Sequence, residues 1–173
     1  MLEYELISAF YGDRCARRSG APYMNHIDEG LVVLERIGAS QTARRAFCLH
    51  PMVQGDEDLA HTWPRVGSLG VPPRVWVVAL EYRNVANAYL ASRAVSSVEE
   101  VALSPVTDVN QMLVADKVQN YCDFLRYHAD SHPRASELDA YFRIWLARLG
   151  ISDDAFTEHR RALSQRASRR ESL

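Results

Sequence analysis

The sequence is poor in the features that mark secreted, disulfide-bonded or membrane proteins. Its three cysteines, Cys15, Cys48 and Cys122, are odd in number and form no C-x-x-C pair, so we expect small core residues in a reducing compartment rather than a disulfide framework. No apolar run approaches the roughly 18 residues that a membrane-spanning helix needs. The first residues, MLEYELISAF, lack the basic segment of a signal peptide. These absences predict a cytoplasmic protein.

An excess of charge of either sign is also absent. Twenty basic residues against twenty-two acidic ones give a net charge of −2, so no bulk field attracts a DNA or RNA polymer or an anionic membrane. With 173 residues, of which 47% are hydrophobic, the chain has the size of one globular domain with a sizeable core. We expect that domain over residues 1–165, followed by a polar tail, residues 166–173, with fraying from about residue 164.

The hydrophobic residues repeat with the period of a helix, which predicts an all-α fold. Helices are expected near residues 2–10, 27–37, 41–50, 56–63, 74–92 and 136–149. Their start signals include Ser40, Asp56 and the Pro72-Pro73 pair, and Gly150 is a stop signal. Ser97 with Glu100 has the spacing of a capping box, which predicts a further helix start. The run VWVVAL suits a short strand, but its continuation into EYRNVANAYLASR favours a buried helix.

Three segments concentrate the groups that can do chemistry: RRSGAPYMNH, FCLHPMVQGDEDL and LVADKVQN. His26 begins one expected helix, His50 ends another, and Asp116 lies within a third. Two neutral imidazoles and one carboxylate, if the fold brings them together, form a site for a divalent ion such as Mn²⁺, Fe²⁺, Co²⁺ or Zn²⁺.

These segments resemble the HD-domain phosphohydrolases, and most closely the hydrolase domain of the RelA/SpoT alarmone enzymes. That family carries R-K-S-G-x-P-Y-x-x-H, H-D-x-x-E-D and L-A-D-K/R-x-x-N, where this chain has RRSGAPYMNH, HPMVQG and VADKVQN. The resemblance covers residues 5–128 and implies an HD-domain-like helical bundle of the small, hydrolase-only kind. It places His26, His50 and Asp116 on metal ligands. It places these residues on or near nucleotide-holding positions: Arg17, Arg18, Tyr23, Lys117 and Asn120.

The middle motif departs from the family. Pro51 replaces the aspartate that should follow the second histidine, and Gln54 and Gly55 replace the glutamate-aspartate pair that orients the attacking water. No catalytic residue can therefore be assigned, although a local shift would bring one of the carboxylates at positions 56–58 into the site. Three protein ligands still suffice for many zinc sites, so we expect a weakly held metal or none. The pattern indicates binding without turnover.

Other polar and aromatic residues have less specific interpretations. The arginines of the RRSG segment also suit a solvated helix end. A polar stripe on one expected helix either lines the same pocket or forms hydrogen bonds between helices; it comprises Tyr82, Arg83, Asn84 and Asn87. Three aromatic residues have core spacing: Tyr141, Phe142 and Trp145. The remaining candidates are interpreted as surface or loop residues: His61, Trp63, His128, His132 and His159.

Three hypotheses about function follow. The first is a protein that binds or sequesters a phosphorylated purine messenger, either an alarmone or a cyclic nucleotide signal, with little or no hydrolysis. The second is an active metal-dependent phosphohydrolase or nucleotidase that uses His26, His50, Asp116 and a substitute carboxylate. The third is a structural or partner-binding helical domain whose pocket is a relic. The aromatic C-terminal helix is a candidate contact for a homo-oligomer.

Overall fold

The structure is a computed structural model that describes residues 1–90 and 94–171, with side chains through residue 166. The described residues form helices and no strand, which confirms the all-α prediction. The elements are α1 (Leu2–Tyr11), α2 (Met24–Arg36), α3 (Gln41–Leu49), α4 (Pro51–Gln54), α5 (Asp56–Thr62), the 3₁₀ helix η1 (Trp63–Ser68), α6 (Pro73–Leu90), α7 (Thr107–Tyr127), α8 (Ala135–Arg148) and α9 (Asp153–Glu171).

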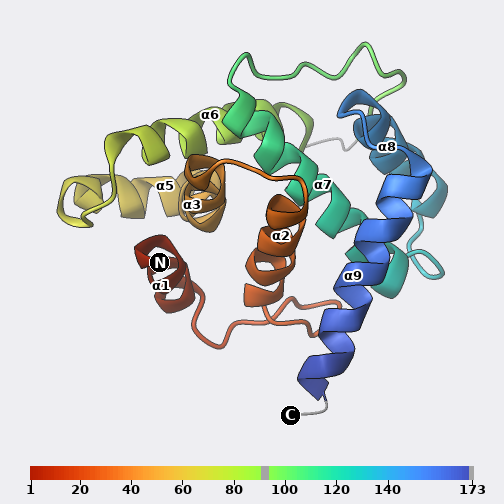
Figure 1. Cartoon of the computed structure of the whole chain (residues 1–173), viewed down its shortest axis with the longest axis horizontal. Coiled ribbons are helices and arrows are strands. Elements are labelled where there is room, and N and C mark those ends of the chain that lie inside the picture. The colour runs from red at the N-terminus through yellow and green to blue at the C-terminus, as the bar shows by residue number, and fades with distance from the viewer. Residues whose placement is uncertain (91–93, 172–173) are drawn as a thin grey trace.

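Helix α7 is the centre of the fold. It crosses the middle of the molecule in Figure 1, and α2, α3, α6, α8 and α9 all pack against it. Its buried side chains are apolar at most positions, as expected of a helix that is covered on several sides. Three buried positions are polar: Asp116, Lys117 and Gln119. Because burying polar groups is costly unless they are paired, these three residues mark where the core contains a site.

A close approach of α2 and α3 depends on one glycine. A Cβ atom placed on Gly30 would lie 2.2 Å from Cε1 of the Phe47 ring. Only glycine therefore lets the Phe47 ring occupy the space between the two helices. This matters for the site, because the Phe47 ring contacts the imidazoles of both His26 and His50, with ring centroids 5.4 and 4.8 Å away.

Several predicted helix boundaries are confirmed. The Ser40 hydroxyl accepts a hydrogen bond from the amide of Ala43 at 3.0 Å and donates one to Asp108 at 2.6 Å, so it caps α3 and links that helix to α7. Helix α5 begins at Asp56, and α6 begins at Pro73 and contains the VWVVAL run. Gly150 follows α8 with φ of 75°, a conformation that glycine adopts readily.

One boundary prediction is wrong. No helix begins at Ser97: Glu100 instead accepts a hydrogen bond from the amide of Ser96, and the Tyr89 hydroxyl bonds the Glu100 carbonyl at 2.9 Å and the Ala102 amide at 2.7 Å. These bonds occupy backbone groups that a helix would use. The segment from about residue 164, where we expect fraying, belongs to α9, which is helical through Glu171. The expected end of α6 at residue 92 lies outside the described residues.

Two predictions about burial need correction. Cys15 is exposed in the loop between α1 and α2, whereas Cys48 and Cys122 are buried, and all three are free. His159 is buried at 7% exposure instead of lying on the surface, because α9 packs against α2 and α7. His61 and Trp63 are exposed as predicted.

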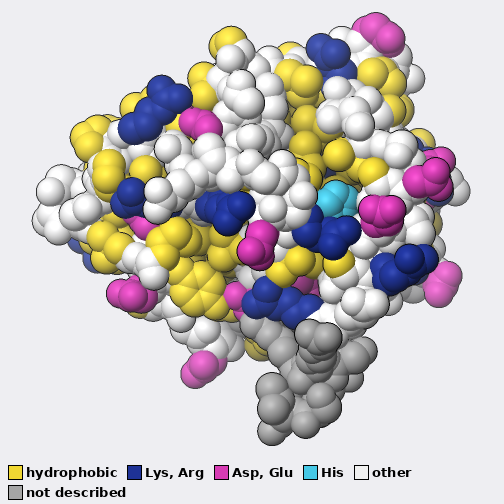
Figure 2. Space-filling view, in the orientation of Figure 1, with side chains coloured by type: hydrophobic (Ala, Val, Ile, Leu, Met, Phe, Trp, Pro, Cys, Tyr) yellow, Lys and Arg dark blue, Asp and Glu magenta, His cyan; other side chains and the backbone are white. Residues whose placement is uncertain are grey.

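The face of the molecule in Figure 2 carries basic and acidic side chains interspersed among hydrophobic ones. This distribution matches the near balance of charges in the sequence, since it gathers no broad patch of one sign on that face. Among the described helices, none is both long enough and apolar enough to cross a membrane.

Candidate functional site

The segment between α1 and α2, residues 12–23, folds as a tight turn that we call the rim loop. Cys15 and Pro22 form an antiparallel bridge, and the Ala16 amide donates to the Ala21 carbonyl at 2.9 Å. Gly20 has φ of 69°, which favours glycine at this position. The turn carries Arg17 and Arg18 at its tip, and both are exposed.

Arg14 anchors the rim loop to α1. Its guanidinium donates hydrogen bonds to the Phe10 carbonyl at 2.6 Å and the Tyr11 carbonyl at 3.1 Å. These carbonyls lie in the last turn of α1, where a cation interacts favourably with the helix dipole. The same guanidinium lies 5.0 Å from the ring centroid of Phe10 and 5.8 Å from that of Tyr23. Sequence reasoning missed Arg14, although a basic residue four positions after Phe10 is a usual signal of a helix end.

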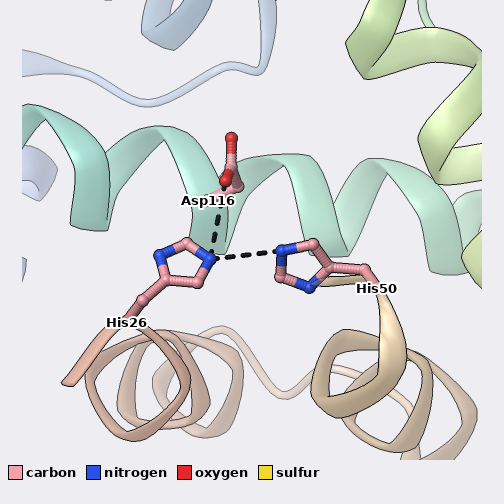
Figure 3. A group of neighbouring side chains, drawn as sticks. All are labelled: His26, His50 and Asp116. Atoms are coloured by element: carbon pink, nitrogen blue, oxygen red, sulfur yellow. Dashed lines mark hydrogen bonds and ion pairs between the residues drawn. The ribbon is translucent and has the colours of Figure 1, made fainter. Parts of the chain in front are cut away.

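Three predicted metal ligands converge, and we call them the floor: His26 from α2, His50 from the end of α3, and Asp116 from α7 (Figure 3). Their candidate ligand atoms lie within 4.8 Å of one another. The two Nε2 atoms are 3.2 Å apart, and His26 Nε2 is 3.8 Å from Asp116 Oδ1. This geometry confirms that the three side chains form one cluster capable of holding a metal ion.

His50 has its ring fixed by the backbone. Its Nδ1 donates to the Phe47 carbonyl at 2.6 Å, so in the neutral ring Nε2 keeps a lone pair that faces His26. Burial, together with the nearby His26, lowers the pKa of His50 to about 3. The imidazole is therefore neutral at physiological pH, the form that ligates metals.

Asp116 is ionised in spite of its burial. Burial opposes ionisation, but the Lys117 ammonium 2.9 Å from Oδ2 and the two imidazoles outweigh it and lower the pKa of Asp116 to about 2. Asn120 donates to Oδ1 at 2.8 Å. Burial, and then the charge of Asp116, raise the pKa of Tyr82 well above its ordinary value.

Lys117 is the sole lysine in the sequence and is 3% exposed. Its ammonium lies 4.8 Å from the ring centroid of Trp145 and 5.8 Å from that of Tyr141, so two aromatic rings of α8 face the cation. Sequence analysis predicted Tyr141 and Trp145 as core residues, and they are buried. It missed their contact with Lys117, which depends on how α8 packs against α7.

A cavity of about 830 Å³ opens between the floor and the rim loop. All the predicted site residues line it: Arg17, Arg18, Tyr23, His26, His50, Asp116, Lys117 and Asn120. The three residues that depart from the family motif line it too: Pro51, Gln54 and Gly55. The fold thus brings the three motif segments to one cavity.

The polar stripe of α6 divides between the cavity and helix packing. Tyr82 lines the cavity, whereas Asn84 is exposed and outside it. Arg83 pairs with Asp56. Asn87 accepts a hydrogen bond from the Gln54 amide and donates to the Gln54 carbonyl at 3.1 Å. Arg83 and Asn87 therefore hold the segment of residues 54–56 against α6.

None of the three substitute carboxylates joins the floor. Asp56 is paired with Arg83, Glu57 is exposed, and Asp58 lines the cavity without belonging to the cluster. Over residues 1–90 and 94–166, whose side chains are described, the cluster contains no fourth histidine, cysteine, aspartate or glutamate. The two histidines at the end of α7, His128 and His132, line the cavity and follow the helix end as predicted.

Comparison of the chain with family models, with curated proteins and with solved structures finds no match. The resemblance to HD-domain phosphohydrolases is therefore carried by the motif residues alone. What the structure adds is their convergence on one cavity.

Proposed function

We propose that this protein binds a phosphorylated purine nucleotide, such as an alarmone or a cyclic nucleotide signal, and hydrolyses it little or not at all. One observation carries the proposal. A single cavity joins the basic rim loop to a floor that has three metal-ligand candidates and, among the described side chains, no fourth one.

The rim loop supplies the charge that a phosphate needs. Arg17 and Arg18 line the cavity, and neither makes a hydrogen bond or ion pair with another described residue. Guanidinium groups that are not engaged in the protein are available for bidentate hydrogen bonds to phosphate oxygens. Lys117 contributes positive charge deeper in the cavity, but its ammonium is already paired with Asp116. We therefore assign the main phosphate contacts to the two arginines.

The segment after His50 argues against turnover. Pro51 has no side-chain group that can ligate a metal, and Gly55 has no side chain at all. The Gln54 amide is held by Asn87 and is not a base. No group at these positions can take a proton from an attacking water. The cavity can then bind the ligand without hydrolysing it.

The floor fits a divalent ion only in part. Two imidazoles and one carboxylate match a three-ligand site, but Lys117 neutralises the charge of Asp116 and so weakens the attraction for a cation. A bound ion would add positive charge beside the phosphates and polarise them. We expect loosely held metal that a chelator removes.

The test is a binding and turnover screen. The purified protein is titrated with linear alarmones, nucleoside triphosphates and cyclic dinucleotides by calorimetry, and the same ligands are incubated with Mn²⁺ and followed by chromatography. We expect binding of at least one ligand without loss of that ligand. The triple variant Pro51→Asp, Gln54→Glu, Gly55→Asp should gain hydrolysis. Absence of binding across the panel contradicts the proposal.

A second candidate function is metal-dependent phosphohydrolysis. It is favoured by the arrangement of His26, His50 and Asp116, whose ligand atoms all lie within 4.8 Å. Loss of any ligand over many turnovers with Mn²⁺, abolished by Asp116→Asn, would establish this function instead. Asp58 is then the first carboxylate to test as a base, because it lines the cavity.

A further inference from the structure

One glutamine contacts the Nδ1 atom of the His26 ring. Gln119 lies on α7 three residues after Asp116, on the same face of the helix, and is fully buried. Its Oε1 is 2.7 Å from His26 Nδ1. Its Nε2 donates to Glu29 Oε2 at 3.2 Å and to Asp123 Oδ2 at 2.8 Å. One side chain thus connects His26 to two carboxylates.

The two carboxylates decide which way the amide faces. The oxygen and nitrogen of a glutamine amide are assigned from their partners, and an ionised carboxylate only accepts hydrogen bonds. Nε2 must therefore face Glu29 and Asp123, which leaves Oε1 toward His26. An amide oxygen also only accepts, so His26 Nδ1 carries the proton.

We propose that Gln119 is the positioning residue of the site, which fixes the neutral His26 ring as its Nδ1–H tautomer. His26 Nε2, His50 Nε2 at 3.2 Å and Asp116 Oδ1 at 3.8 Å are then three acceptors that face one another, an arrangement that needs a cation or a shared proton between them. The Phe47 carbonyl fixes His50 in the same tautomer. Both rings therefore present an Nε2 lone pair to the space between the three floor residues. This inference rests on the proposed function only in taking the floor as a cation or ligand site.

Arg126 completes the arrangement from outside. Its Nη1 lies 3.4 Å from Glu29 Oε1 and 3.9 Å from Asp123 Oδ1. One guanidinium therefore offsets the charges of both carboxylates that hold the glutamine. From the surface inward, the Arg126 guanidinium is followed by the two carboxylates, then by the Gln119 amide and then by the His26 imidazole. Each hydrogen-bond donor in this series faces an acceptor, which leaves a single orientation for the His26 ring.

The test reads the tautomer directly. Two-bond ¹H–¹⁵N correlation spectra, recorded at a pH where both rings are neutral, distinguish the protonated from the unprotonated ring nitrogen. We expect the wild-type His26 to show Nδ1–H. In the double variant Glu29→Gln, Asp123→Asn the amide partners can both donate and accept, so the glutamine is free to turn over. We expect His26 to become a mixture of tautomers there, although His26 and Gln119 are unchanged.

Metal affinity gives a second readout. Co²⁺ titration followed by visible absorption should show affinity reduced by about 10- to 100-fold in Gln119→Met, the usual cost of losing the hydrogen bond that orients a metal-binding histidine. Gln111→Met is the matched control, because Gln111 accepts a hydrogen bond from the Ser40 amide and lies outside the cavity. It should leave the His26 tautomer and Co²⁺ affinity unchanged.

Two results would overturn the inference. One is an Nε2–H tautomer for His26 in the wild type, and the other is an Nδ1–H tautomer that persists in both Gln119→Met and the double variant Glu29→Gln, Asp123→Asn. The wild-type spectrum needs no variant to fold and no metal to bind. Failure of nucleotide binding with the Nδ1–H tautomer intact would sink the proposed function alone.

Discussion

The floor and the rim loop line the same cavity but differ in how they are held. Each polar side chain of the floor has at least one protein partner, and Asp116 and His50 are 6% and 5% exposed. Arg17 and Arg18 on the rim loop are exposed and make no described hydrogen bond or ion pair. Substitutions in the floor should therefore change stability, because they strand buried groups. Substitutions on the rim should change affinity.

The largest effect is expected from separating Asp116 and Lys117. Asp116→Leu leaves the Lys117 ammonium buried at 3% exposure without its carboxylate, and breaking a buried pair in this way costs about 3–5 kcal/mol. The double variant Asp116→Leu, Lys117→Met removes both charges and should recover most of that loss. Urea unfolding of the three proteins measures both values. Equal stability of the single and double variants would show that the pair is not a unit.

A smaller effect is expected from Gly30→Ala. In an open helix position this change usually stabilises by up to about 1 kcal/mol, but here the new Cβ meets the Phe47 ring at 2.2 Å. We expect a net cost of about 1–3 kcal/mol, and disturbed packing of Phe47 against the two imidazoles.

The sign of the stability change in Gly30→Ala shows whether the Phe47 ring blocks the new Cβ, and two further variants serve as controls. Gly67→Ala, at a glycine whose Cβ would meet nothing within 4 Å, should be close to neutral in thermal unfolding. Phe47→Leu added to Gly30→Ala should return part of the loss. A stabilising Gly30→Ala would mean that α2 and α3 can separate without cost.

The helices were predictable because hydrophobic period and local signals agree in them. Ser40, Asp56 and Pro73 act at the positions where the sequence places helix starts. The capping-box spacing of Ser97 and Glu100 predicted a helix that does not form, because this spacing is a local signal. The Tyr89 hydroxyl reaches the backbone of this segment from α6, and the local sequence does not show that contact.

The site was predictable as far as its motif residues go. His26, His50 and Asp116 belong to recognisable segments, and the structure brings them together. Gln119 occupies a position that the motif leaves free, and Arg14 lies before the motif, where only the general signal of a basic residue at a helix end marks it. The contacts of Tyr141 and Trp145 with Lys117 arise from the packing of α8 on α7, which one sequence does not specify.

The rim should respond in the opposite way to the floor. Arg17→Gln and Arg18→Gln should each weaken binding of the nucleotide found in the screen by about tenfold, or about 1.4 kcal/mol, while stability stays within about 0.5 kcal/mol of the wild type. Calorimetric titration measures the first quantity and urea unfolding the second. Arg65→Gln, at an exposed arginine outside the cavity, is the control. A rim variant that loses stability but keeps affinity would reverse the comparison.

The smallest effect tests whether burial itself, rather than proximity to the cavity, makes a polar group sensitive. His159 on α9 is buried and lies outside the cavity, and its Nδ1 has no hydrogen-bond partner among the described residues. Burial, and then the charge of Arg36, lower the pKa of His159 below 6.5, against the opposing charge of Glu158. The unfolded chain therefore binds more protons at His159 than the folded chain does as the pH falls below about 6.5. The contribution of His159 to the free energy of unfolding is thus complete above that pH and is lost on acidification.

We expect His159→Gln to make the free energy of unfolding depend less steeply on pH between pH 7 and 5. The change in slope should be smaller than the single-proton limit of about 1.4 kcal/mol per pH unit. An unchanged slope would show that the ring reaches water when it is protonated, and that burial at this position does not make a polar group sensitive.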